Sequence, residues 1–262
     1  IDLGRDEGLV DFAQLRDVDG VRCVIHCATR GLGPARIDAD YARRERAARD
    51  AGIGWGAYHF GDGLSDPAAQ ADFFLGFLHG VARTNGTLDR PLLTVLDNEG
   101  RHRMTLRDVA VFARRVQVVT GRYPGLYVNR KELGVKDAGQ FAGDPPWAGV
   151  VLRCWLWVAD YSRPEPWVLE FPAAWQRWTL WQYSGDFDGS VASAINRPGF
   201  DGQVSEGAFR RRGSRVLPDG QRTRRSVDRN LFSGSAVEWD AFHATNATAP
   251  ATWRFDVVQP AK

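Results

Sequence analysis

The sequence predicts an α/β protein built around a mainly parallel sheet. Apolar, strand-like segments alternate with charged helical segments four times before residue 120, which is the pattern of strands joined by helical crossovers. Right-handed crossovers leave a closed barrel and a doubly wound sheet as the two candidate architectures. The chain has 262 residues, 44% of them hydrophobic, and ten tryptophans, which suits a packed core in one large domain or two small ones.

In the first half of the chain the sequence predicts regular strands and helices, and particular residues mark where the helices begin or end. Gly52 closes one helix, Pro67 stands at the first position of another, and Thr105 is placed to cap a third. Strands are expected at 1–4, 21–28, 53–60, 91–97 and 125–128, and helices at 12–18, 38–51, 67–82 and 105–120.

The pattern changes after residue 140. Strands are expected at 155–161, 178–184 and 226–232, and no helical repeat separates the first two. Residues 185–225 are rich in Gly, Arg, Ser and Pro and predict a long loop. Residues 244–252 are small and polar and resemble a linker. Trp253 to Val258 is expected either to begin another element or to pack back on the domain.

The segment 91–100 carries the strongest functional signal. A continuous apolar run, Leu92 to Leu96, is typical of a strand that is buried on both faces. Asp97 and Glu99 follow it, and the period of two predicts that both point the same way. Two acids at a strand end suit acid/base catalysis, and in a barrel catalytic residues sit at the carboxyl ends of strands. The alternative is a solvated turn that happens to carry acids.

Composition narrows the remaining function classes. A net charge of +2 gives no global field for nucleic acid, and no run is apolar enough to span a bilayer. Cys23 and Cys27 would lie roughly 13 Å apart in a strand, and with Cys154 they make no disulfide framework. No spacing of His, Cys and acids suggests zinc, and no signal peptide is visible at Ile1.

Several motifs, taken in order, resemble glycoside hydrolase family 25, which includes cell-wall N-acetylmuramidases and many phage endolysins. The resemblance runs from Ile1 to about Phe232. Its motifs are residues 1–2, 56–60, 97–99, 156–161, 178–184 and 227–230. It implies a flattened (β/α)5β3 TIM-like barrel, with a catalytic domain at 1–234 that contains an insertion at about 185–225, and a tail or linker at 235–262.

The resemblance also implies a chemistry. The family cleaves the β-1,4 bond between N-acetylmuramic acid and N-acetylglucosamine, without a metal or other cofactor. Four carboxylates would surround the site: Asp2, Asp97, Glu99 and Asp228. Glu99 is the implied general acid/base, and the three aspartates would stay ionised. Either an aspartate or the substrate's 2-acetamido group would attack the anomeric carbon, and both routes stay open.

Aromatic residues near predicted strand ends suggest a sugar groove, because aromatic rings stack on sugar faces. The candidates are Tyr58, Tyr127, Trp157, Tyr161, Trp181 and Tyr183. For each of them, the alternative is a place in the core. His59 also lies near a strand end, where we expect packing or hydrogen bonding rather than catalysis.

Two features depart from the family pattern. Gly4, Arg5 and Asp6 stand where the family often has Ser followed by His-His, which changes the substrate contacts expected at this edge. The insertion is longer than usual and basic; its arginines, with those just after it, are Arg210, Arg211, Arg212, Arg215, Arg222, Arg224, Arg225 and Arg229. They would bind anionic wall polymers or phage structural proteins, or belong to a solvated loop. We expect the segment from about Gly199 to Arg225 to lie outside the barrel strands.

Three functions remain as hypotheses. The leading one is a peptidoglycan-degrading lysozyme that acts outside the cell at the bacterial wall, released by a phage or carried on its virion. The second is a virion or tail component that keeps this fold with reduced or no activity. The third is a non-catalytic wall-binding module. Partners are then peptidoglycan and, through the insertion, wall polymers or phage proteins, with no nucleic acid and no membrane.

Overall fold

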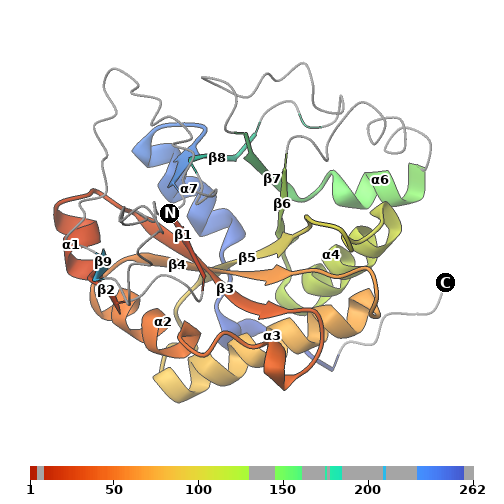
Figure 1. Cartoon of the computed structure of the whole chain (residues 1–262), viewed down its shortest axis with the longest axis horizontal. Helices are drawn as coiled ribbons and strands as arrows, with labels where there is room; N and C mark the ends of the chain where they lie inside the picture. Colours follow the sequence, from red (N-terminus) through yellow and green to blue (C-terminus); the bar gives the residue numbers. More distant parts are fainter. Residues whose placement is uncertain are drawn as a thin grey trace, which may run out of the picture.

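Eight strands form one sheet that curves into a nearly closed barrel (Figure 1). The computed structural model describes residues 1–4, 9–129, 145–160, 175, 178–184, 209–210 and 229–256. The strands, in sheet order, are β1 (Asp2–Leu3), β3 (Cys23–Arg30), β4 (Gly54–Phe60), β5 (Leu92–Asp97), β6 (Gly125–Asn129), β7 (Trp155–Ala159), β8 (Leu180–Ser184) and β10 (Arg229–Phe232). Neighbours are parallel except β8 and β10, which are antiparallel. The predicted α/β barrel is confirmed.

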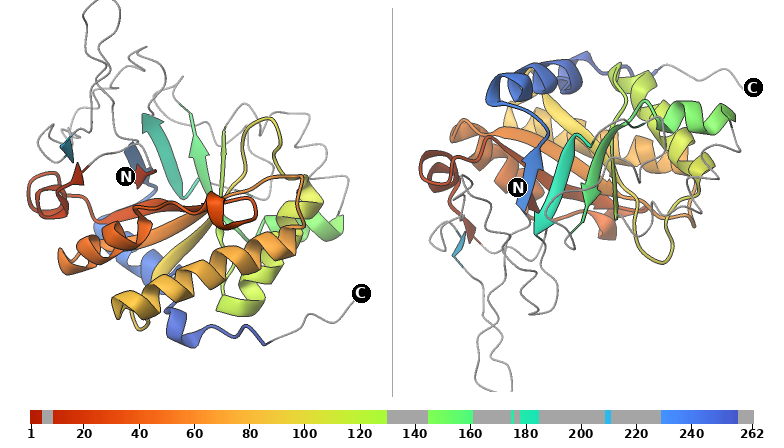
Figure 2. Two further views of the ribbon diagram at one scale, coloured as in Figure 1. Left: turned by 60° about the horizontal axis from the view of Figure 1, so that its bottom comes forward. Right: turned by 90° about the horizontal axis from the view of Figure 1, so that it is seen from above.

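Most of the described helices cover the outside of the barrel (Figure 2). They are α1 (Phe12–Asp17), α2 (Tyr41–Asp50), α3 (Pro67–Asn85), α4 (Leu106–Thr120) and α6 (Pro145–Val151), with short 3-10 turns η1 (Pro34–Arg36) and η3 (Pro250–Thr252). A further helix, α7 (Ala236–Asn246), packs Trp239 and Phe242 against the core inside the barrel. The sequence did not predict α6 or α7. No helix in the described ranges is both long and apolar enough to cross a membrane.

The apolar run of β5 is explained by two cores, one on each face of the sheet. Leu92 and Leu96 belong to the outer core, between the sheet and the helices. Leu93 and Val95 belong to the inner core, which fills the barrel. Because successive side chains of a strand alternate between its faces, a strand between two cores is buried at every position, as all six residues of β5 are.

Local signals set the helix ends as the sequence predicted. The Thr105 hydroxyl accepts a hydrogen bond from the Asp108 backbone N–H, and the Asp108 carboxylate accepts one from the Thr105 backbone N–H, which completes a capping box at the start of α4. Pro67 opens α3 behind the Asp66 cap. Gly121 ends α4 with a φ of 80°, a conformation that glycine adopts at no steric cost.

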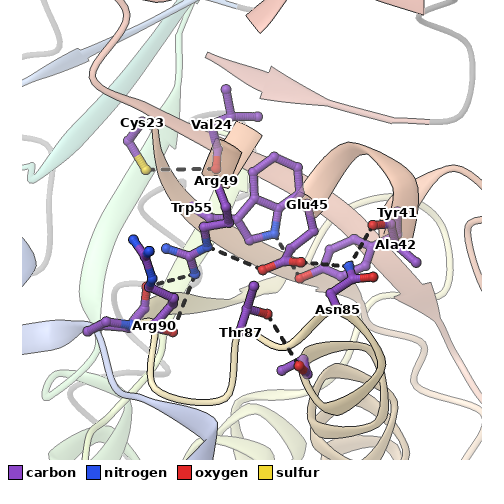
Figure 3. A network of polar contacts seen from close by, with 12 residues as sticks. Cys23, Val24, Tyr41, Ala42, Glu45, Arg49, Trp55, Asn85, Thr87 and Arg90 are labelled. Carbon is purple, nitrogen blue, oxygen red and sulfur yellow. Dashed lines mark hydrogen bonds and ion pairs between the residues drawn. The ribbon is translucent and has the colours of Figure 1, made fainter. Parts of the chain in front are cut away.

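A polar network ties α2 to α3 and to the segment that enters β5 (Figure 3). Arg49 donates to the Glu45 carboxylate at 3.2 Å and to the Pro91 carbonyl at 2.8 Å. Asn85, at the end of α3, donates to the other Glu45 oxygen at 2.8 Å. This network fixes the amino end of β5, opposite the end that carries the acids.

The C-terminal segment packs on the barrel instead of trailing from it. The backbones of Leu92 and Thr248 exchange two hydrogen bonds, at 3.1 and 3.0 Å. Trp239 of α7 lies 5.3 Å from Phe232 between ring centroids, and Phe242 lies 5.4 Å from Trp155 of the inner core. The linker prediction for 244–252 is therefore wrong, because these residues end a helix and then pair with a barrel strand.

Two further observations concern the late chain. Trp253 is buried and belongs to the outer core, so this residue packs back on the domain, one of the two possibilities that the sequence left open. Phe209 and Arg210 form β9, which pairs antiparallel with β2 (Leu9–Val10) in a separate two-stranded sheet. This part of the insertion lies outside the barrel strands, as expected. The rest of 185–225 falls outside the described residues.

Candidate active site

β5 delivers Asp97 to the carboxyl end of the barrel. Leu93 and Val95 face the inner core, and the period of two continues that row to Asp97. Asp97 is 7% exposed, and its backbone lies in register with Phe60 on one side and Tyr127 on the other. Glu99 follows on the connecting loop and is partly exposed.

Asn98 holds the loop that carries Glu99. Its side-chain carbonyl accepts a hydrogen bond from the Met104 N–H at 2.8 Å, and its amide donates to the Met104 carbonyl at 3.2 Å. Its own N–H donates to the Tyr127 carbonyl at 3.0 Å. These bonds fix the chain on both sides of Glu99 to β6 and to the start of α4.

Asp2 is the acceptor at the centre of a buried network. Both of its carboxylate oxygens accept from the Gln182 amide at 3.1 Å, and Oδ1 also accepts from Asn230 Nδ2 at 2.7 Å. Charge-assisted hydrogen bonds of this kind stabilise a carboxylate that is only 7% exposed. Asp2 is therefore held by β8 and β10 in a fixed place.

Tyr127 and Trp157 extend the same network. The Tyr127 hydroxyl donates to Gln182 Oε1 at 2.8 Å, and Trp157 Nε1 donates to Asn230 Oδ1 at 2.7 Å. Their rings meet edge to face with centroids 4.9 Å apart. Tyr127 is 7% exposed and Trp157 is 2% exposed, so both support the carboxylate network, and their contact with sugar stays a prediction.

Tyr58 connects the two buried acids electrostatically. Burial raises the pKa of its phenol well above the ordinary value, and Cys27, Asp97 and Asp2 raise it further. The phenol therefore stays protonated and keeps an O–H to donate. Burial likewise raises the pKa of the Cys27 thiol to about 11, so that group is neutral.

A cation lies at the same end of the barrel. Arg30, the last residue of β3, places its guanidinium carbon 5.3 Å from the centre of the Phe60 ring. Burial acts against its charge, but nearby Cys27, Tyr58 and Asp97 raise its pKa overall. The site thus combines carboxylates with one guanidinium on the neighbouring strands.

The other predicted site residues have different placements. Trp181 lies in the outer core, 1% exposed, and its indole N–H donates to the Asp160 carbonyl at 2.8 Å. It is therefore not brought together with Asp2 and Asp97. Asp228, Tyr161 and the side chain of Tyr183 fall outside the described residues, so their roles stay predictions.

His59 has the structural role that the sequence predicted. It is fully buried, and its two ring nitrogens lie 2.8 Å from the Thr29 hydroxyl and 3.0 Å from the Gln70 side chain. Burial lowers its pKa to about 4, which makes it a neutral hydrogen-bonding group in the core.

The amide partners Gln182 and Asn230 were missed as site residues by sequence reasoning. Both lie inside motifs that carried the family resemblance, but neither can ionise, so neither draws attention as a catalytic group. The sequence did contain a signal, since a strand expected at 226–232 predicts, by its period of two, that Asn230 shares a face with Asp228. Arg30 was also missed, because its place depends on an irregularity in β3.

Solved structures of other proteins share this fold. In three dimensions the chain is similar to the bacterial lysozyme from Streptomyces coelicolor, with a TM-score of 0.62 and 23% identity, covering 94% of this chain and 96% of that one. It is also similar to the muramidase from Trichobolus zukalii, with a TM-score of 0.60 and 22% identity, covering 93% and 97%. At these identities the likeness shows the fold.

Sequence comparison identifies the family. The uncharacterized protein YegX of Escherichia coli K12 is 27% identical over 215 residues, which are 79% of this chain and 70% of that protein. The model of the glycosyl hydrolases of family 25 matches residues 1–190, which include Asp2, Asp97 and Glu99 and cover well over half of the chain. The chain therefore belongs to glycosyl hydrolase family 25.

Proposed function

We propose that this protein is an N-acetylmuramidase that cleaves the β-1,4 bond between N-acetylmuramic acid and N-acetylglucosamine in peptidoglycan, and that it acts outside the cell at the bacterial wall. The observation that supports this proposal is that two buried acids, Asp2 and Asp97, both act electrostatically on Tyr58 in the barrel of a chain that belongs to a glycosyl hydrolase family. Glu99 follows two residues after Asp97 on a loop that Asn98 holds in place.

The roles follow from the chemistry of glycoside hydrolysis. The glycosidic C–O bond breaks, a carboxylic acid gives its proton to the leaving oxygen, and water supplies the hydroxyl at the anomeric carbon. Glu99, which is partly exposed, is the proton donor in this proposal. Asp97 and Asp2 are the carboxylates that stabilise positive charge developing on the sugar ring.

The test is the chemical identity of the new reducing end. Purified protein is incubated with peptidoglycan, and the products are reduced with borohydride and hydrolysed. A muramidase leaves muramic acid at the new reducing end, so borohydride converts muramic acid to its sugar alcohol. A glucosaminidase leaves glucosamine there, so borohydride converts glucosamine instead. Muramic alcohol alone is expected. Glucosamine alcohol, or no new reducing end at all, would contradict the proposal.

A further inference from the structure

We infer that Arg30 is a specificity-determining residue that binds a carboxylate carried by the muramic acid unit of the substrate. The inference rests on the proposed function and extends it. N-acetylmuramic acid differs from N-acetylglucosamine by a lactyl ether, which ends in a carboxylate or carries the stem peptide. A cation at the site is a means of telling the two sugars apart.

An irregularity in the pairing of β3 with β4 aims Arg30 into the site. Cys27 pairs with Tyr58, but Thr29 pairs with His59, so one extra residue of β3 is accommodated between them. Arg30 consequently lies opposite Phe60. Bulges re-aim side chains in this way and are frequent next to active sites.

The register of the strands places Arg30 in line with Asp97. Arg30 pairs with Phe60, and Phe60 pairs with Asp97. These three residues form one row across the carboxyl ends of β3, β4 and β5, and the guanidinium stacks on the Phe60 ring in the middle of the row. A group bound by Arg30 is thus about two strand spacings, roughly 10 Å, from Asp97.

Among the described residues, no carboxylate forms an ion pair with the guanidinium, although Asp97 acts on it electrostatically. Within the described part of the chain, Arg43, Arg49 and Arg115 each form an ion pair with an acid, whereas no carboxylate lies within 4 Å of Arg30. Its neighbours are the Phe60 ring and the neutral Cys27 thiol. Arg30 is partly buried, and a charge removed from water is costly unless it is paired, so a ligand carboxylate would satisfy it.

The chemistry of the site favours a carboxylate over a hydroxyl group as the ligand. The planar guanidinium offers paired N–H donors that match the two oxygens of a carboxylate. Asp2, Asp97 and Glu99 make this end of the barrel negative, so an anionic substrate group would be repelled without a compensating cation. Two sources carry this group: the free lactyl carboxylate of peptide-free glycan and the carboxylates of the stem peptide.

The experiment compares kcat/KM on three glycans: peptide-free strands with free lactyl carboxylates, the same strands as methyl esters, and strands that bear stem peptides. The parent is expected to prefer free carboxylates to methyl esters by about tenfold or more, as a charge-assisted hydrogen bond predicts. In Arg30→Met this ratio should fall to near one. Arg30→Lys should restore part of it, because lysine supplies charge without the fork. A preference for peptide-bearing strands that Arg30→Met also abolishes would identify the stem peptide as the source.

Arg36→Met is the matched control, because Arg36 is exposed in the same connection after β3 and its removal changes the net charge equally. It should keep the parent ratio. The ratio is measured within each variant, so partial unfolding does not alter it. A parent ratio near one, or an Arg30→Met variant that loses activity equally on all three glycans, would overturn the inference while leaving the proposed function standing. A parent that cleaves none of them would overturn both.

Discussion

Asn230 donates a hydrogen bond to Asp2 over 2.7 Å, and this contact joins the last strand of the barrel sheet to the first. β1 and β10 are the two edge strands of the sheet. A hydrogen bond between their side chains therefore joins the two edges and closes the barrel. The acceptor in this closure is a predicted active-site carboxylate. The same contact therefore helps to close the barrel and to hold Asp2 in place.

Asn230→Leu should destabilise the protein by about 1–3 kcal/mol, because it leaves the Trp157 indole N–H and one lone pair of Asp2 without a partner. Urea unfolding at neutral pH measures the loss. A free energy of unfolding equal to that of the parent would show that the contact does not hold the barrel closed.

Asn230→Asp tests the charge at the same position. The new carboxylate would face Asp2, and two adjacent carboxylates raise the pKa of one of them. A carboxyl whose folded pKa is raised costs stability as pH rises through its titration range. The deficit of this variant relative to the parent should therefore be larger at pH 7 than at pH 4. A deficit independent of pH would contradict an Asp2 carboxylate at this distance.

Trp239→Ala should cost about 3–5 kcal/mol, the usual price of removing a buried aromatic ring. Trp239 is 9% exposed and anchors α7 on Phe232. Val237→Ala in the same helix is the control, since Val237 is 77% exposed and should change the melting temperature little. Equal small shifts in both variants would support a loosely attached tail instead.

The buried histidines predict a loss of stability in mild acid. Burial lowers the pKa of His59 to about 4 and that of His26 to about 3, whereas both take up protons near pH 6.5 when unfolded. The unfolded chain then binds more protons, so stability falls as pH drops from about 6.5 toward 4, by about 1.4 kcal/mol per pH unit for each histidine. His59→Gln should reduce the slope between pH 6 and 5 by about one proton. An unchanged slope would show that His59 titrates normally in the folded protein.

The sequence predicted the buried central strand because β5 is almost entirely apolar before Asp97, as a strand between two cores requires. It predicted the acids because Asp97 ends that strand. It did not predict that Tyr127 and Trp157 turn their polar atoms to Gln182 and Asn230. Such contacts join residues far apart in sequence, and local periodicity says nothing about them.

The linker prediction failed for a related reason. Residues 244–252 are small and polar, which is typical of a linker, but Thr248 gains its partners from Leu92, more than 150 residues earlier. The position of Arg30 was hidden in the same way, because the irregularity that aims it is a property of the pairing between β3 and β4.

Glu99→Gln gives the most direct test of the central claim, that acids at the end of β5 hydrolyse the glycan. The amide has nearly the same shape but has no proton to give, so release of reducing ends from peptidoglycan should fall by about 10²–10⁴-fold, with the urea midpoint unchanged. Asp89→Asn, an exposed acid before the other end of β5, should release reducing ends at the parent rate. A Glu99→Gln variant that hydrolyses peptidoglycan as fast as the parent would contradict the assignment.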